Sequence, residues 1–250
     1  MANPVLNDTI FRKNAATFTQ SGVMTVKGTM TKAFLLLLMV IAAGAYTWKI
    51  FYEATNPASI TSWMWGGLIV GFISAMVISF KPNTAPFLSP IYAAAEGLVL
   101  GAVSAIYNSA FAETAPNIVS SAVILTLLCA LVMFAIYRSG LIKVNGTFAK
   151  VITTSLITIC IFYLGSMLLS LFGVNVAILH DSSPLSIGIS VIITAVAAFS
   201  LLMDFNFIEQ ASAMGAPKQM EWYGAFGLMV TLVWLYLEIL KLLGKISSRE

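Results

Sequence analysis

Charged residues are scarce in this chain of 250 residues, where they make up 9% of the sequence, whereas a soluble domain carries about a quarter. Hydrophobic residues make up 59%, and the mean hydropathy is +0.94. The few charges nearly balance, with 13 Lys and Arg against 10 Asp and Glu, and they form no basic stripe. The composition therefore excludes nucleic-acid binding and most soluble folds, and it predicts an integral protein of the lipid bilayer.

Histidine and cysteine are also rare, with one His and two Cys. This excludes a His-rich zinc site and a disulfide scaffold. Cys129 and Cys160 both fall in apolar runs, where we expect them to pack as small apolar residues. The sequence contains no Ser, His and Asp set, no cluster of metal ligands and no phosphate-binding loop. We therefore expect neither an enzyme nor a bound cofactor.

Seven apolar runs follow one another along the chain, each near the roughly 20 residues that a helix needs to cross about 30 Å of hydrocarbon. The breaks between them contain Pro, Gly and Asn, which stop helices. This pattern predicts an all-α integral membrane fold, a bundle of seven transmembrane helices. The runs are 33–51, 62–80, 87–111, 118–137, 151–173, 185–207 and 222–243.

The chain divides into a polar N-terminal segment over 1–32, a seven-helix membrane domain over 33–245 and a short tail over 246–250. Lys and Arg predict the orientation, because they are enriched in cytoplasmic loops. Nine of them fall on the side of the N-terminus and four on the other side. The N-terminus is therefore predicted to be cytoplasmic and the C-terminus to lie outside. The basic C-terminal tail favours a rival topology, with six spans and a re-entrant seventh segment.

Three carboxylates lie inside apolar runs: Glu96 in the third, Asp204 in the sixth and Glu238 in the seventh. A charge at membrane depth costs a few kcal/mol or more, so each of these groups needs a partner, water or a proton. That cost makes the three residues the first candidates for a functional site.

Helical spacing places two of the acids on polar stripes. At about 100° per residue, the stripe of the sixth run spans roughly 120°, and the seventh run has a comparable stripe. Such stripes are expected to face the interior of a bundle, since lipid tails offer no hydrogen bonds. The third run adds a seam of small and polar residues that allows close helix packing. The members are Ser186, Ser190, Thr194, Ala197, Ser200 and Asp204 in the sixth run, Gly227, Thr231, Trp234, Glu238, Lys241 and Lys245 in the seventh, and Gly97, Gly101, Ser104 and Asn108 in the third.

If Asp204 and Glu238 meet in the interior, they are expected to share one proton, because like charges in a dry site cannot both ionise cheaply. The shared proton would tie the sixth helix to the seventh, and its loss would favour their separation. The deprotonated pair would also suit a calcium ion, which prefers carboxylate oxygens. Lys81, at the end of the second run, is a candidate basic partner for Asp204. The pairing requires the seventh helix to begin in the cytoplasm and to enter the bilayer near Gly227.

Each acid also has a structural interpretation. Asp204 would be a span-end acid that reaches the cytoplasmic interface. Glu238 would form a local i,i+3 pair with Lys241. Glu96 would be a protonated acid that is hydrogen-bonded across helices. Outside the runs, Glu209 and Glu221 are expected to cap or solvate the cytoplasmic loop.

The segments around these acids resemble the transmembrane Bax inhibitor motif family. The segment from Leu201 to Glu209, Leu-Leu-Met-Asp-Phe-Asn-Phe-Ile-Glu, is similar to the sixth-helix motif of that family, in which an Asp ends a hydrophobic helix. The Leu-Tyr-Leu-Glu-Ile-Leu segment over 235–240 resembles its seventh-helix motif, and Ala-Glu-Gly over 95–97 resembles its third-helix segment. The order and spacing of the three motifs carry the resemblance, which covers the whole membrane domain.

The resemblance implies a seven-helix bundle with a central seventh helix and a pH-sensitive calcium leak across the membrane. It implies that Asp204 and Glu238 stand where the paired acids of the family stand, and that Lys81 stands near the basic cluster of bacterial members. This sequence departs from the pattern in three ways. Glu238 replaces the commoner Asp, and the single Lys81 lacks the bidentate fork of Arg. The loop between the two acids is long and includes Gly-Ala-Pro-Lys over 215–218.

The sequence thus predicts a proton-modulated calcium leak channel in the inner (cytoplasmic) membrane of a bacterium. A non-conducting regulator is the alternative, because some members of the family bind and modulate a membrane protease. An intramembrane aspartyl-type protease is a third hypothesis, since two acids on adjacent helices can activate water. It is disfavoured because one acid is Glu and neither acid lies in a Gly-Asp motif.

Overall fold

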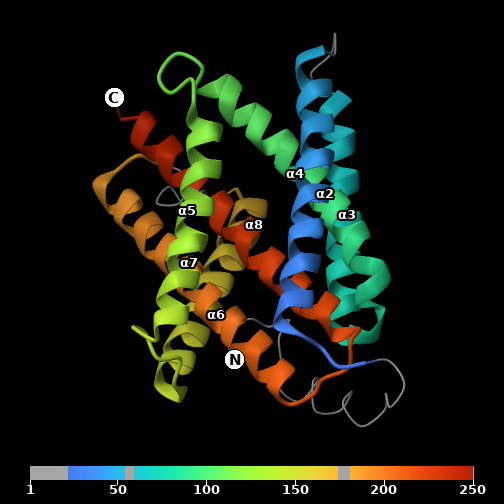
Figure 1. Cartoon of the computed structure of the whole chain (residues 1–250). Coiled ribbons are helices and arrows are strands. Elements are labelled where there is room, and N and C mark those ends of the chain that lie inside the picture. The colour runs from blue at the N-terminus through green and yellow to red at the C-terminus, as the bar shows by residue number, and fades with distance from the viewer. Residues whose placement is uncertain (1–21, 54–58, 174–180, 250) are drawn as a thin grey trace. The chain divides into compact units, whose positions relative to one another are not determined.

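A computed structural model describes residues 22–53, 59–173 and 181–249 of the chain. These residues form seven helices that are long and apolar enough to cross a membrane, together with one short 3₁₀ helix (Figure 1). The fold is therefore an all-α membrane bundle, as the sequence predicts. The helices are α2 (Val26–Glu53), α3 (Ser59–Phe80), η1 (Pro82–Thr84), α4 (Ala85–Ala110), α5 (Ile118–Ser139), α6 (Gly146–Leu171), α7 (Pro184–Ala213) and α8 (Met220–Ser247).

Each helix covers most or all of one predicted apolar run, but several extend beyond it. Helix α2 begins seven residues before its run, inside the predicted N-terminal segment, and α7 continues six residues past its run. Backbone hydrogen bonds continue through polar residues at the edge of a bilayer, whereas an apolar run marks only the hydrocarbon part. Residues 1–21, with Arg12 and Lys13 of the orientation argument, lie outside the described residues.

Local sequence explains where two of the helices stop and start. Gly140, directly after α5, adopts the left-handed conformation with φ of 68°, one that glycine accepts without a steric penalty. Asn145 directly precedes α6, and its side-chain oxygen accepts a hydrogen bond of 2.8 Å from the backbone N–H of Phe148. This is an N-cap, which satisfies one of the free amide groups at a helix start.

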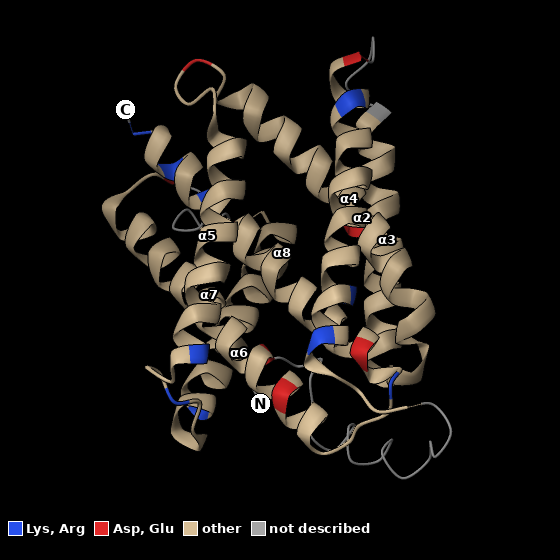
Figure 2. Ribbon diagram, viewed as in Figure 1, with Lys and Arg blue, Asp and Glu red and all other residues tan. Residues whose placement is uncertain are grey.

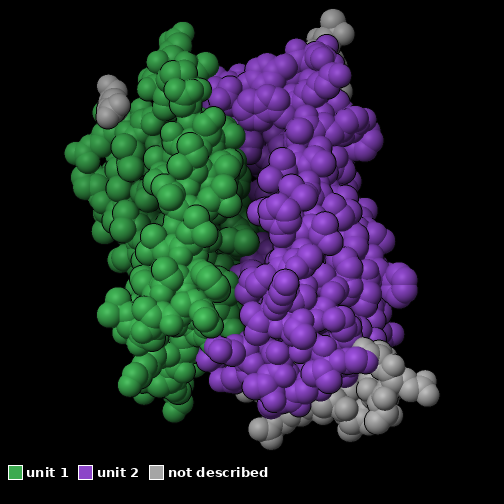
Figure 3. All heavy atoms as spheres, in the orientation of Figure 1, with its two compact units in different colours: residues 1–3, 111–205, 231–250 green, residues 4–110, 206–230 purple. Residues whose placement is uncertain are grey.

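The chain forms two compact units (Figure 3). Unit 1 comprises residues 1–3, 111–205 and 231–250, and unit 2 comprises residues 4–110 and 206–230. Helices α7 and α8 each contribute residues to both units. Within unit 2, α4 packs against α2 and against α3.

Burial differs strongly among the seven spans. In the most apolar 18-residue window of each helix, 61% of residues are buried in α8 and 6% in α6. Helix α8 has the highest share of the seven, in agreement with a central seventh helix. Its largest buried side chains include Met220, Tyr223 and Phe226.

Candidate functional site

Asp204 is fully buried in α7, with 0% of its surface exposed. By axial rise it lies nine residues, or about 14 Å, before the end of the helix at Ala213. The next residue, Phe205, packs edge-on against Phe134 of α5, with ring centroids 5.3 Å apart. The interpretation of Asp204 as a span-end acid stays a prediction, because the apolar run of this helix ends only three residues after Asp204 and α7 continues past that run.

Glu238 is also buried, at 1% exposed, and three donors converge on its carboxylate. The Tyr163 hydroxyl of α6 donates to it at 3.1 Å, and the Trp234 indole N–H donates at 3.1 Å. The Lys241 ammonium completes the set at 2.9 Å, and it also lies 4.8 Å from the centre of the Tyr163 ring. The local i,i+3 pair with Lys241 is thus present.

The next turn of α8 binds α7 through a second lysine. Lys245 donates hydrogen bonds of 2.8 Å to the hydroxyls of Ser186 and Ser190. Both serines are buried and belong to the polar stripe predicted for this helix. The Lys245 bonds therefore join the two predicted stripes directly within unit 1.

The burial of the remaining stripe residues agrees with the prediction that the stripes face inward. On α7, Ala197 and Ser200 are buried, and Thr194 is half-buried. On α8, Thr231 is buried and Trp234 is half-buried. We call the polar residues of unit 1 on these stripes the polar seam. They are Ser186, Ser190, Thr194, Ser200 and Asp204 on α7, with Thr231, Glu238, Lys241 and Lys245 on α8.

The direct pairing of Asp204 with Glu238 stays a prediction. Helix α8 begins at Met220, two residues before the predicted run, and Glu238 lies 18 residues, or about 27 Å, along it. Lys81, the proposed partner of Asp204, is exposed and immediately precedes η1 in unit 2. Its pairing with Asp204 is likewise a prediction.

Glu96 belongs to unit 2, where it is half-buried on α4. Tyr92 lies one turn earlier on the same helix, near the Glu96 carboxylate. A Cβ atom built at Gly71 of α3 would lie 3.5 Å from the Glu96 carboxylate. Glu96 therefore faces α3. Among the described residues, no group of three or more His, Cys, Asp and Glu is arranged to hold a metal ion.

Glu221 of unit 2 has several hydrogen-bond and ion-pair partners among the described residues, and the sequence does not reveal most of them. The sequence predicts that it caps or solvates the cytoplasmic loop, but it is fully buried, so it is not solvated. Lys32 forms an ion pair and hydrogen bond with it, and the backbone N–H and hydroxyl of Thr25 donate at 3.0 and 2.9 Å. Lys218 adds a second ion pair at 3.4 Å. Of these contacts, only the pair of Lys218 with Glu221, three residues apart, could be expected from the spacing in the sequence.

Backbone hydrogen bonds join the same two segments, the one before α2 and the one before α8. The N–H of Met24 donates to the carbonyl of Ala216 at 2.7 Å, and the N–H of Lys218 donates to that of Gly22 at 3.0 Å. The hydroxyl of Ser212 donates to the carbonyl of Met24 at 3.1 Å. The segment before α2 is therefore bound to the connection between α7 and α8. We call the side chains of Thr25, Lys32, Lys218 and Glu221 the Glu221 clasp.

Most charged residues outside the polar seam lie near helix ends (Figure 2), as expected for membrane spans. The fold and site thus define a seven-helix membrane protein with acids buried on its sixth and seventh spans. The family model described as Bax inhibitor 1 like matches residues 3–248, nearly the whole chain. The chain belongs to this family, which confirms the resemblance found in the sequence. The comparisons with curated proteins and with solved structures gave no match.

Proposed function

We propose that the protein is a pH-sensitive calcium leak channel, gated by protons on Asp204 and Glu238. One observation carries this proposal: both carboxylates are buried, on two membrane helices of the same unit. Burying a carboxylate in a membrane helix is expensive, and such residues mark ion and proton pathways. Family membership supports a Bax inhibitor-like membrane protein.

Protons would act on the polar seam by changing the charge of its two acids. When one proton is shared by the two acids, it ties α7 to α8, and its loss leaves two like charges that repel. The proton has a competitor at Glu238, because the Lys241 ammonium, which donates to the carboxylate at 2.9 Å, stabilises its ionised form. Protonation of Glu238 would remove the charge that Lys241 balances. Both the acid pair and the lysine pair would therefore respond to pH, which gives the seam two ways to change state.

Calcium would be the transported ion, not a resident cofactor. Two carboxylates supply hard oxygen ligands, and the hydroxyls of Ser200 and Thr231 lie on the same polar seam. Lys81 would hold Asp204 ionised in one state. No catalytic role is assigned to either acid, so the protein is proposed not to be an enzyme. Its place would be the cytoplasmic membrane of a bacterium, with the N-terminus inside.

The test measures calcium entry into dye-loaded liposomes that contain the purified full chain, between pH 5 and pH 8. Asp204→Asn and Glu238→Gln each remove one titrating acid with little change of shape. Glu113→Gln is a matched control, because this residue is exposed and lies outside the seven helices. We expect a pH-dependent leak that either seam variant flattens and that the control does not alter.

Two outcomes would contradict the channel. Absence of flux above that of empty liposomes, in protein shown to be folded, would leave the non-conducting regulator, which predicts co-purification with a membrane protease or another membrane partner. Peptide cleavage in detergent that Asp204→Asn abolishes would instead favour the aspartyl-type protease. A leak with unchanged pH dependence in both seam variants would show that Asp204 and Glu238 do not gate the channel.

A further inference from the structure

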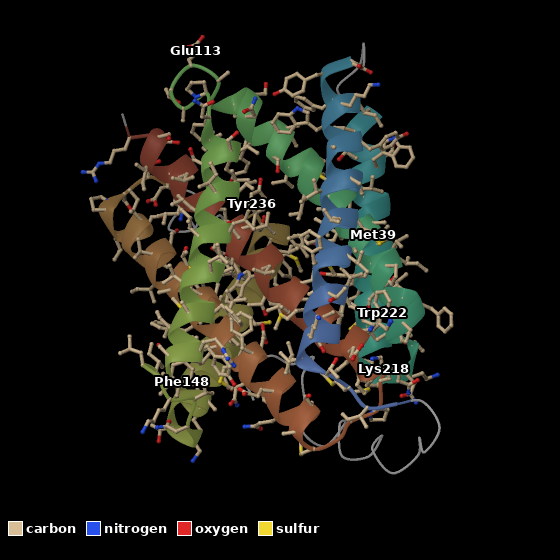
Figure 4. All side chains as sticks on the ribbon, in the orientation of Figure 1. Met39, Glu113, Phe148, Lys218, Trp222 and Tyr236 are labelled. Carbon is tan, nitrogen blue, oxygen red and sulfur yellow. The ribbon has the colours of Figure 1, made fainter. Side chains whose placement is uncertain are left out.

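A cavity of about 470 Å³ opens beside the Glu221 clasp, within unit 2. Three lysines line it: Lys27 and Lys32 from the first turns of α2, and Lys218 from the segment before α8. Glu221 is the single acid in the lining, so the formal charge of the wall is positive by two. Figure 4 labels Lys218 and Trp222 together at this end of the unit.

The charges of the wall are not all neutralised by the clasp. Lys32 pairs with Glu221, and Lys218 reaches the same carboxylate only at 3.4 Å, with its side chain about half exposed at 52%. Lys27 is exposed and has no ion-pair partner among the described residues. The cavity therefore presents two cationic groups to whatever enters it, and an anion is the ligand that this charge favours.

The wall formed by α2 changes character with depth. Lys27, Thr31 and Leu35 are spaced four residues apart, so they lie along one face of the helix, and all three line the cavity. The face passes from an ammonium at the helix start, through a hydroxyl one turn on, to an apolar side chain about 12 Å along. A soluble anion would use only the first part of this wall, whereas a phospholipid would use all of it.

Two more features place the cavity at the level of lipid headgroups. It lies at the start of α2 and the start of α8, where membrane helices meet the interface. Trp222 also lines it, and the Lys32 ammonium lies 5.5 Å from the centre of the Trp222 ring. Tryptophan and lysine at helix ends are typical of this level of the bilayer.

We propose that this cavity binds the headgroup of an anionic phospholipid. Lys27 and Lys218 would bind the phosphate, and Leu35 would contact the start of an acyl chain. Basic pockets between transmembrane helices are known sites for anionic headgroups. Because Lys32 and Lys218 also hold Glu221, a bound lipid would stabilise the contact between the start of α2 and the α7–α8 connection. The proposal does not depend on ion conduction.

Native mass spectrometry of the full chain tests the proposal. Protein is released from mixed micelles of phosphatidylglycerol and phosphatidylcholine with identical acyl chains, and the ratio of retained lipids is measured. We expect wild type to favour phosphatidylglycerol, and we expect Lys27→Gln with Lys218→Gln to lower the ratio by about fivefold for each lysine. Lys143→Gln with Lys150→Gln removes the same charge from two exposed lysines of unit 1 and is expected to leave the ratio unchanged.

Two further measurements distinguish lipid binding from misfolding of the variants and from binding of a soluble anion. Lys27→Gln alone guards against misfolding, because Lys27 takes no part in the Glu221 clasp. Millimolar inorganic phosphate is added in parallel; if it displaces the lipid completely, the cavity is a site for a soluble anion and the proposal fails. Equal retention of both lipids by wild type, or an equal loss of preference in the Lys143 and Lys150 variant, would also overturn it.

Discussion

The two buried glutamates in the described part of the chain are stabilised by different kinds of donor. Glu221 receives hydrogen bonds from the backbone and hydroxyl of Thr25 and ion pairs from two lysines, one of them on a distant helix. Glu238 accepts hydrogen bonds from the Tyr163 hydroxyl of α6 and from the Trp234 indole and the Lys241 ammonium of its own helix. The donors of Glu221 tie separate segments together, whereas only Tyr163 brings a second helix to Glu238. Glu221 therefore has a structural role, and Glu238 is better placed to change state.

The role of Glu221 leads to a prediction about stability. Glu221→Gln keeps the shape of the side chain but leaves Lys32, 18% exposed, without its counter-ion. Breaking a buried ion pair costs about 3–5 kcal/mol, and we expect about 2–3 kcal/mol because both lysines keep some contact with water. The apparent melting temperature in detergent, followed by tryptophan fluorescence, should fall. Glu53→Gln, which breaks the exposed Lys49–Glu53 pair, should have almost no effect. Equal melting temperatures for the two variants would show that the clasp does not hold the fold.

At the scale of the helix, the apolar runs and their Pro, Gly and Asn breaks are sufficient to predict seven spans. The ends of the helices are not predictable in this way, because the polar turns at the bilayer edge have no apolar signal. The small-residue seam of the third run is also visible in the sequence, but its partner helix is not. The structure places Gly97 and Gly101 against α2 and bonds Asn108 to Tyr52 at 2.8 Å. Helix pairing depends on contacts between distant residues, which one sequence does not reveal.

The contact between α2 and α4 makes a second prediction. A Cβ atom at Gly101 would lie 2.6 Å from the Cα of Gly44 and would also overlap the Thr47 side chain. Since backbone cannot move aside cheaply, Gly101→Ala should destabilise the protein by about 1–3 kcal/mol. Gly165→Ala, on α6, is the matched control, because nothing lies within 4 Å of its added Cβ. It should leave the melting temperature unchanged or raise it, since alanine favours helix. A loss of stability in both variants would mean that the close approach is not the cause.

At the scale of the whole chain, the candidate site was predictable only in part. The polar stripes and the three membrane acids follow from helical spacing and from the cost of charge in hydrocarbon. The donors to Glu238 include Tyr163, 75 residues away, and the clasp brings Lys32 to Glu221 over 189 residues. Such long-range contacts are set by the packing of helices and carry no local signal. Asp204 lies on the predicted polar stripe, but its complete burial required the packing of α7 against other helices.

The number of spans also decides on which side of the membrane the chain ends. Helix α8 is continuous over 28 residues, or about 42 Å, which is long enough to cross the bilayer and favours a full span over a re-entrant segment. Seven crossings put the two termini on opposite sides. With nine Lys and Arg on the N-terminal side, we expect that side to be cytoplasmic. Alkaline phosphatase fused after residue 250 should therefore be active and green fluorescent protein dark, with the reverse pattern for fusions at 141–145, the short connection after α5. Fluorescence from both fusion sites would show that α8 returns to the cytoplasmic side, and the rival topology with a re-entrant seventh segment would then be correct.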